Sequence, residues 1–100
     1  MIIVTGAVRF GNGEIERLRS ALTRNVESSR KEAGCEAYSY TVDLTDPNLL
    51  RITEMWRDEA AVDAHSKKLA ELMAPLDGAK IEAMSVTAYE ASFLKNIIGE

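Results

Sequence analysis

The chain of 100 residues has very few of the side chains that carry metal, disulfide and cofactor chemistry. It contains one cysteine, Cys35, and one histidine, His65. A single cysteine cannot form a disulfide within the chain, which favours a reducing compartment, so we expect a cytoplasmic protein. One histidine and one cysteine cannot supply the usual zinc ligand clusters, and the turn Gly11-Asn12-Gly13 has no following lysine to bind phosphate. We therefore expect neither a metal nor a cofactor.

The sequence also lacks long apolar runs and an excess of positive charge. No run approaches the roughly 20 apolar residues that span a bilayer, and no basic segment precedes the first strand-like stretch. We therefore expect neither a signal peptide nor a membrane partner. The formal net charge is −4, whereas a protein that binds nucleic acid needs a basic stripe. Hydrophobic residues at 46% and charged residues at 28% are ordinary for one globular domain.

The first half of the chain predicts a strand, a helix and a hairpin. Residues 1–10 are rich in β-branched side chains and apolar on both faces, which is typical of a central strand. Residues 14–33 carry apolar side chains at spacings of three and four, which predicts a helix with Asn12 as a candidate cap and Gly34 as its stop. Residues 35–44 and 49–56 flank a turn signal at 45–48, so these two strands form a hairpin.

The second half predicts a helical segment, a last strand and an apolar tail. Asp58 is a candidate N-cap for the helical segment, with a break near Ser66 and Lys67 and an end at Asp77-Gly78. Residues 79–89 alternate as a strand. The tail, residues 90–100, keeps four large apolar side chains at helical spacing, and we expect it to pack on the domain or on a partner subunit. They are Phe93, Leu94, Ile97 and Ile98.

The resulting order, β-α-β-β-α-β, predicts an α+β, ferredoxin-like domain over residues 1–89. In this fold an antiparallel sheet carries its helices on one face. Several strands are apolar on both faces, so the helices alone cannot bury all of the apolar surface. A second copy that packs sheet against sheet would bury the remainder, and we therefore expect a homodimer.

Glu54, Trp56 and His65 form the constellation that points most clearly to chemistry. Strand alternation puts Glu54 and Trp56 on one face, and His65 lies on the apolar stripe of its helix. His65 is either a core histidine bonded to a backbone carbonyl or to Glu54, or a general acid or base beside a pocket. Glu54 is either paired with an arginine or a backbone amide, or it orients His65 or a substrate. Tyr38 and Tyr40 share one strand face and offer an apolar wall with polar tips.

The chain resembles the antibiotic biosynthesis monooxygenase domain over about residues 1–89. The pattern is a helix end that leads into Gly-Cys, a strand that ends in Glu-x-Trp, and a helical histidine. It is carried by Ser28-Ser29-Arg30-Lys31-Glu32-Ala33-Gly34-Cys35-Glu36-Ala37-Tyr38, Asp43, Asp46-Pro47, Glu54-Met55-Trp56-Arg57-Asp58 and His65. The resemblance implies a dimer whose two sheets form a joint α/β barrel, with a pocket between sheet and helices in each subunit.

The resemblance also implies an activity, the oxidation of a small quinol or polyketide-type aromatic by molecular oxygen without a cofactor. His65 would be the catalytic base, and Trp56, Glu54, Tyr38 and Tyr40 would contact the substrate. Two alternatives remain open. The first is a dimer that binds a small molecule without catalysis. The second is haem binding and degradation with His65 as axial ligand. Haem-degrading members of the family also carry an asparagine in the first strand, and residues 1–10 contain none, which weakens this alternative.

Overall fold

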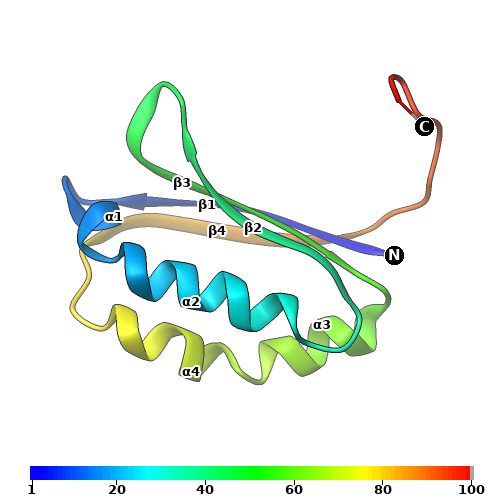
Figure 1. Cartoon of the computed structure of the whole chain (residues 1–100), viewed down its shortest axis with the longest axis horizontal. Helices are drawn as coiled ribbons and strands as arrows, with labels where there is room; N and C mark the ends of the chain where they lie inside the picture. The colour runs from blue at the N-terminus through cyan, green and yellow to red at the C-terminus, as the bar shows by residue number, and fades with distance from the viewer. Residues whose placement is uncertain (100) are drawn as a thin grey trace.

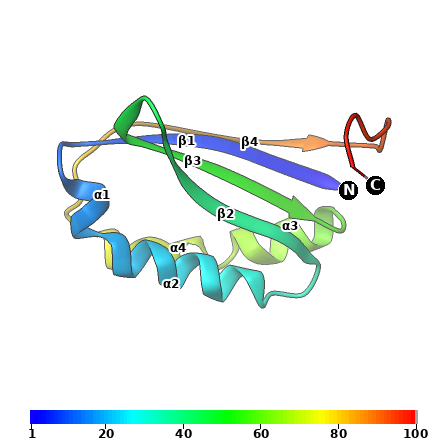
Figure 2. The ribbon, with the colours of Figure 1, turned by 45° about the horizontal axis from the view of Figure 1, so that its top comes forward.

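A computed structural model describes residues 1–99 and confirms the ferredoxin-like α+β fold. The four strands form one antiparallel sheet in the order β2-β3-β1-β4, and the helices cover only one of its faces (Figures 1 and 2). The elements are β1 (Ile2–Phe10), α1 (Glu14–Arg17), α2 (Arg19–Arg30), β2 (Cys35–Asp43), β3 (Asp46–Trp56), α3 (Glu59–Ser66), α4 (Leu69–Met73), the 3-10 helix η1 (Ala74–Leu76) and β4 (Ile81–Glu90). The joint barrel involves a second copy and stays a prediction.

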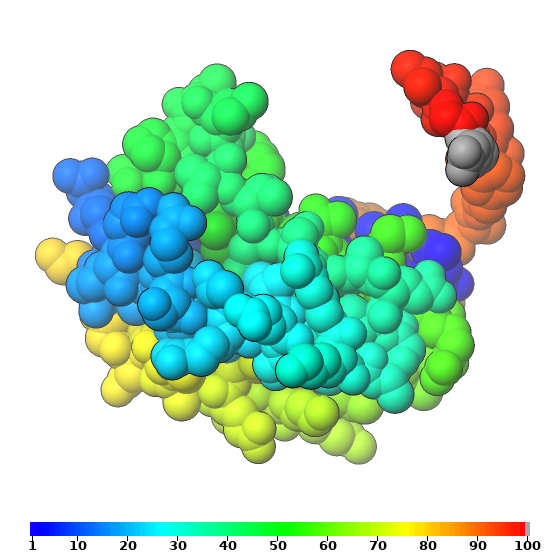
Figure 3. Space-filling view, in the orientation of Figure 1, coloured from blue at the N-terminus to red at the C-terminus, as the bar shows by residue number. Residues whose placement is uncertain are grey.

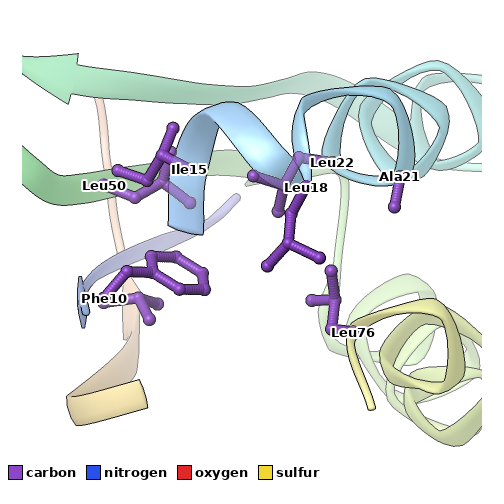
Figure 4. Close-up of a cluster of buried hydrophobic side chains, with 8 residues drawn as sticks. Phe10, Ile15, Leu18, Ala21, Leu22, Leu50 and Leu76 are labelled. Carbon is purple, nitrogen blue, oxygen red and sulfur yellow. The ribbon is translucent and has the colours of Figure 1, made fainter. Parts of the chain in front are cut away.

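The layer between helices and sheet holds two packed clusters. The first lies under α1 and α2 and is closed by Leu76 of η1 (Figure 4). It comprises Val8, Phe10, Ile15, Leu18, Ala21, Leu22, Leu50 and Leu76. The second lies towards α3 and comprises Ile2, Val4, Tyr38, Trp56 and Ala61. Their members on β1 alternate along the strand, as expected for a central strand with one face towards the helices.

The predicted helix over 14–33 is shorter and broken. Leu18 separates α1 from α2 with φ −97° and ψ 4°, and its buried side chain joins the first cluster. The helical segment ends at Arg30 rather than at residue 33. Asn12 does not cap it, because the N-cap residue is Gly13 in the left-handed region at φ 80°.

The hairpin turn comes earlier than predicted. β3 already begins at Asp46, so only Leu44 and Thr45 connect the strands. The Asp43 carboxylate accepts hydrogen bonds from the backbone N–H and the hydroxyl of Thr45, which fixes this tight turn. Further along, Asp58 accepts from the backbone N–H of Ala61 at 2.9 Å, which confirms the predicted N-cap.

The break in the second helical segment is also confirmed. α3 ends at Ser66 and α4 begins at Leu69, so two short helices replace one continuous helix. None of the helices in residues 1–99 has the length and apolar character needed to cross a membrane.

The tail is not helical over residues 91–99, although its spacing predicted pairing on a helix. The side chains of Phe93, Leu94, Ile97 and Ile98 are 78%, 85%, 87% and 92% exposed. The tail leaves β4 on the side of the sheet away from the helices and stands clear of the domain (Figures 1 and 3). An isolated chain therefore leaves these four side chains uncovered. Residue 100 lies outside the described residues.

Gly34 is a glycine that the local geometry requires. Its φ is +82°, and a Cβ placed there would lie 2.6 Å from the Cβ of Ala61. We expect Gly34→Ala to lower the free energy of unfolding by about 2–4 kcal/mol, because the left-handed region costs about 1–2 kcal/mol and the clash adds to that. The midpoint of urea denaturation measures this loss.

Gly13→Ala is the matched control. Gly13 has a similar φ of +80°, but no atom of residues 1–99 lies within 4 Å of the position that a Cβ would occupy there. This control should lose only the backbone contribution of about 1–2 kcal/mol. Equal losses in the two variants would contradict a role for close packing between Gly34 and α3.

Candidate functional site

The structure brings Tyr38, Glu54, Trp56 and His65 together between the sheet and α3. Tyr38 and Trp56 belong to the second cluster, and the indole of Trp56 is completely buried. The exposed fractions of Tyr38, Glu54 and His65 are only 4%, 6% and 4%. We call these four residues the Trp56 cluster. Strand alternation placed its three strand residues on the correct face, because β2 and β3 pair with Tyr38 opposite Glu54.

Trp56 and Glu54 form a buried hydrogen bond with each other inside this cluster. The indole N–H of Trp56 donates to Oε1 of Glu54 at 2.8 Å. The partner of Glu54 is thus an indole on its own strand, not the arginine or backbone amide that we expected. Burial raises the pKa of Glu54, and the hydrogen bond from Trp56 and the proximity of His65 oppose that rise.

His65 is held on three sides. Its Nδ1 lies 2.8 Å from Oε2 of Glu32, a partner that we did not predict. Its ring centroid lies 4.7 Å from that of Trp56 and 5.4 Å from that of Tyr38. The rings of His65 and Trp56 are therefore in contact, and no open space separates them. The burial of His65 does not favour the alternative in which it is an axial haem ligand.

Tyr38 of the Trp56 cluster is linked to Tyr40, which lies outside the cluster. Their hydroxyl oxygens lie 3.1 Å apart. Burial raises the pKa of Tyr38 and also that of Tyr40, and the nearby charge of Glu54 acts in the same direction. Both hydroxyls therefore stay protonated at neutral pH and are available as hydrogen-bond donors.

Tyr40 also faces a hollow of about 200 Å³ between α2 and the β2–β3 hairpin, which we call the inner hollow. Most of its wall is apolar. It is lined by Ile15, Arg19, Leu22, Thr23, Val26, Tyr40, Val42 and Leu50. Its volume lies below the roughly 300–1,000 Å³ of typical sites for drug-sized ligands, which favours a small molecule. Neither Trp56 nor His65 lines it, so Tyr40 is the candidate residue that joins the hollow to the cluster.

Sequence reasoning missed three polar residues that complete the site. Glu32 holds His65, and Asn25 donates from Nδ2 to the carbonyl oxygen of Leu72 at 3.0 Å. Ser29 is fully buried beside Tyr38. The available signal was position, because Asn25 and Ser29 lie three and seven residues after the buried Leu22 on α2.

No group of three or more histidine, cysteine, aspartate or glutamate side chains within residues 1–99 is arranged to hold a metal ion. Cys35 is half-buried, and burial raises the pKa of its thiol. A thiol with a raised pKa is a poor nucleophile at neutral pH.

Comparison with known proteins identifies the family. The family model for antibiotic biosynthesis monooxygenase matches residues 1–70, so the chain belongs to this family. It is also similar to an uncharacterized protein of Synechocystis, with 34% identity over 64 residues. That match covers 64% of this chain and 44% of the relative, so the chain spans less than half of that protein.

Solved structures show the same architecture over nearly the whole chain. A candidate antibiotic biosynthesis monooxygenase from Deinococcus radiodurans is 29% identical, with a TM-score of 0.89 over 99% of this chain and 100% of that one. A conserved protein from Methanosarcina mazei is 22% identical, with a TM-score of 0.81 over 91% and 92% of the two chains. The second likeness concerns the fold alone.

The raised pKa of Glu54 predicts a pH dependence of stability. A neutral Glu54 is favoured in the fold, so its contribution is present below the unfolded pKa of about 4.3 and is lost as pH rises through the folded pKa. Glu54→Gln keeps an acceptor for Trp56 but cannot ionise. We therefore expect this variant to gain stability relative to the wild type as pH rises, as measured by urea denaturation midpoints between about pH 4 and pH 8.

The exposed Glu36→Gln is the matched control and should show no such divergence. A difference between Glu54→Gln and the wild type that does not change with pH would contradict the raised pKa of Glu54.

Proposed function

We propose that the protein is a cofactor-independent monooxygenase that oxidises a small electron-rich aromatic, a quinol or a polyketide-type phenol, with molecular oxygen. The observation that carries the proposal is Tyr40, which lines an apolar hollow and whose hydroxyl oxygen lies 3.1 Å from that of the buried Tyr38. Family membership supports the same reaction class. The proposal names the chemical class of the substrate and not an individual compound. A reducing, cytoplasmic setting, argued from the single cysteine, belongs to the same proposal.

In this proposal the substrate ring lies in the inner hollow, and its hydroxyl group faces Tyr40. The apolar walls from α2 and the hairpin exclude water from the ring. Tyr40 donates a hydrogen bond to the oxygen that becomes negatively charged, which stabilises the phenolate. Tyr38 supports Tyr40 from behind, and the packed Trp56 fixes Tyr38 through an edge contact at 6.3 Å between ring centroids.

The proton leaves towards the buried acid and base groups. We assign His65, with Glu54, as the group that takes the proton of the substrate through the paired tyrosine hydroxyls. Glu32 orients the His65 ring through Nδ1. This route places the base behind the tyrosines instead of against the substrate, because His65 is only 4% exposed.

Once ionised, the substrate itself supplies the electrons. A phenolate gives one electron to oxygen, and the resulting radical and superoxide combine to form a bond between a ring carbon and oxygen. For a ring CH₂ carbon, loss of water from the hydroperoxide then leaves a carbonyl group. One oxygen atom enters the product, and the other leaves as water with the two hydrogen atoms of that carbon. The protein contributes deprotonation, charge stabilisation and a dry pocket.

A second candidate is a non-enzymatic protein that binds a small molecule. The observation in its favour is the sealed Trp56 cluster, in which Trp56 is fully buried and His65 packs directly against it. In that case Glu54, Trp56 and His65 are structural, and only the inner hollow takes a ligand. Replacing them would then lower stability without a separate effect on ligand binding.

Tyr40→Phe tests the proposed function. Removal of one donor to a developing oxyanion typically lowers kcat by 10²–10³-fold, so we expect a loss of about 10²-fold in oxygen uptake with an active quinol or anthrone substrate. The melting temperature should change little, because Phe keeps the ring packing. Oxygen consumption with a panel of such substrates measures the effect.

Tyr89→Phe is the control, since Tyr89 is 56% exposed on the edge strand β4 and lines a different part of the molecule. No turnover of any substrate, together with ligand binding that survives in His65→Ala, would favour the binding protein. Full activity of Tyr40→Phe would remove the assigned role of Tyr40.

We also propose that the protein forms a homodimer through the face of the sheet that carries no helices. On this face Met55, Ile3 and Tyr89 form one row across β3, β1 and β4, because Ile3 pairs with both neighbours. The hairpin and the tail both stand out from the molecule, and the surface between them is hollowed (Figure 3). A second sheet would bury the apolar row, and the apolar tail would then pack on the partner subunit.

Thr5→Glu tests this assembly. Thr5 is exposed at the centre of β1, where Thr53 and Thr87 flank it, so a charge is tolerated in one chain but would be buried between two sheets. We expect sedimentation of the wild type at twice the chain mass of 11.0 kDa and sedimentation of Thr5→Glu as a monomer. Ser20→Glu on the exposed side of α2 should stay dimeric. A monomeric wild type at micromolar concentration would refute the dimer.

A further inference from the structure

A second hollow adjoins the inner one and extends it along the molecule. This outer hollow of about 310 Å³ lies between the start of α1 and the hairpin. It shares three lining residues with the inner hollow, namely Ile15, Arg19 and Val42. The remaining lining residues of the outer hollow are Asn12, Gly13, Glu16, Pro47 and Asn48. The two hollows therefore form one elongated depression that runs outward from Tyr40.

Arg19 stands where the two hollows meet, and it brings the only positive charge among the described residues that line them. Glu16 brings the only negative charge within that described lining, and its carboxylate is already engaged by Nε and Nη2 of Arg19. It lines the outer hollow and not the inner one. The described lining of the inner hollow thus carries one positive charge and no negative charge, which favours an anionic group on a ligand there.

The ion pair between Arg19 and Glu16 can be exchanged easily. Its two side chains are 63% and 73% exposed and lie three residues apart across the break at Leu18, with Glu16 on α1 and Arg19 on α2. Exposed pairs of this kind contribute little to stability, because both charges remain solvated. A carboxylate that is held nearby by an apolar body can therefore replace Glu16 on the planar guanidinium group, which matches carboxylates in a two-pronged geometry.

We propose that Arg19 selects ligands in which a planar aromatic body carries a carboxylate. The aromatic body occupies the inner hollow against Tyr40, and the carboxylate reaches Arg19 at the junction of the two hollows. The inference rests on the proposed function only in that it concerns the same hollow. It adds a specificity-determining residue and narrows the ligand class to aromatic acids.

Binding of two probes tests this inference without turnover. The probes are 2-naphthoate and 2-naphthamide, which have the same ring system and differ in charge, and isothermal titration calorimetry gives both affinities. We expect the wild type to bind the acid about fivefold more tightly than the amide at low salt, as for a partly exposed charged contact worth up to about 1 kcal/mol. The preference should shrink at high salt, because both charges are accessible to solvent ions.

Three variants should change the affinity for the acid in different ways. Arg19→Gln should bring the ratio of the two affinities close to one without changing the affinity for the amide. Glu16→Gln should raise the affinity for the acid, since it removes the competing carboxylate. Arg24→Gln, an exposed cation of α2 that lines neither hollow, should behave as the wild type. All three positions are exposed, so loss of folding is not expected.

The outcomes separate this inference from the proposed function. Equal affinities of the wild type for acid and amide, no binding of either probe, or an unchanged ratio in Arg19→Gln would overturn the inference. Oxygen uptake with a neutral quinol would still support the monooxygenase in that case. A preference for naphthoate that depends on Arg19 supports the inference even where no quinol or anthrone is oxidised.

Discussion

The buried indole N–H of Trp56 is the constraint on which the rest of the layer depends. A fully buried donor needs an acceptor, and Glu54 provides it from the same strand face two residues earlier. The acceptor is a carboxyl group, so it introduces a titratable group beneath the helices that burial alone would disfavour. Tyr38 and His65 pack around this pair and bring further polar atoms with them. One buried donor thus accounts for a polar centre in an otherwise apolar layer.

Alternation and helical spacing were sufficient to predict the element order, the antiparallel class and the faces of β3. They were insufficient at the ends of helices and strands, where single interactions decide which residue begins or ends an element. Two hydrogen bonds, from the backbone N–H and the hydroxyl of Thr45 to the Asp43 carboxylate, move the hairpin turn towards the N-terminus. The break in the first helix falls at the buried Leu18, and no sequence signal distinguishes this residue from the other stripe residues. The tail was predicted wrongly for a different reason. Its apolar residues have helical spacing, but residues 91–99 pack on no surface of the domain that would stabilise a helix.

The candidate site was predictable where it depends on strand geometry and unpredictable where it depends on long-range packing. Glu54, Trp56, Tyr38 and Tyr40 share a face because successive side chains alternate across a strand. The partner of His65 could not be foreseen, since Glu32 lies 33 residues earlier in the loop after α2. The position of the inner hollow depends on how far α2 stands from the hairpin, and this distance reflects the packing of both core clusters rather than any local motif.

Side chains become more polar from the inner hollow towards the Trp56 cluster. In the proposed function, this arrangement lets the buried cluster take part in the reaction with oxygen. The wall of the inner hollow is mainly apolar, and Tyr40 offers a neutral hydroxyl there. Tyr38 lies behind it, and the carboxyl group of Glu54 and the imidazole of His65 lie in the same buried cluster as Tyr38. A charged base at the wall would draw water into the hollow and repel or trap an anionic substrate. In the proposed mechanism the neutral hydroxyl of Tyr40 stands in front of the titratable groups, and the proton moves inward along the paired hydroxyls.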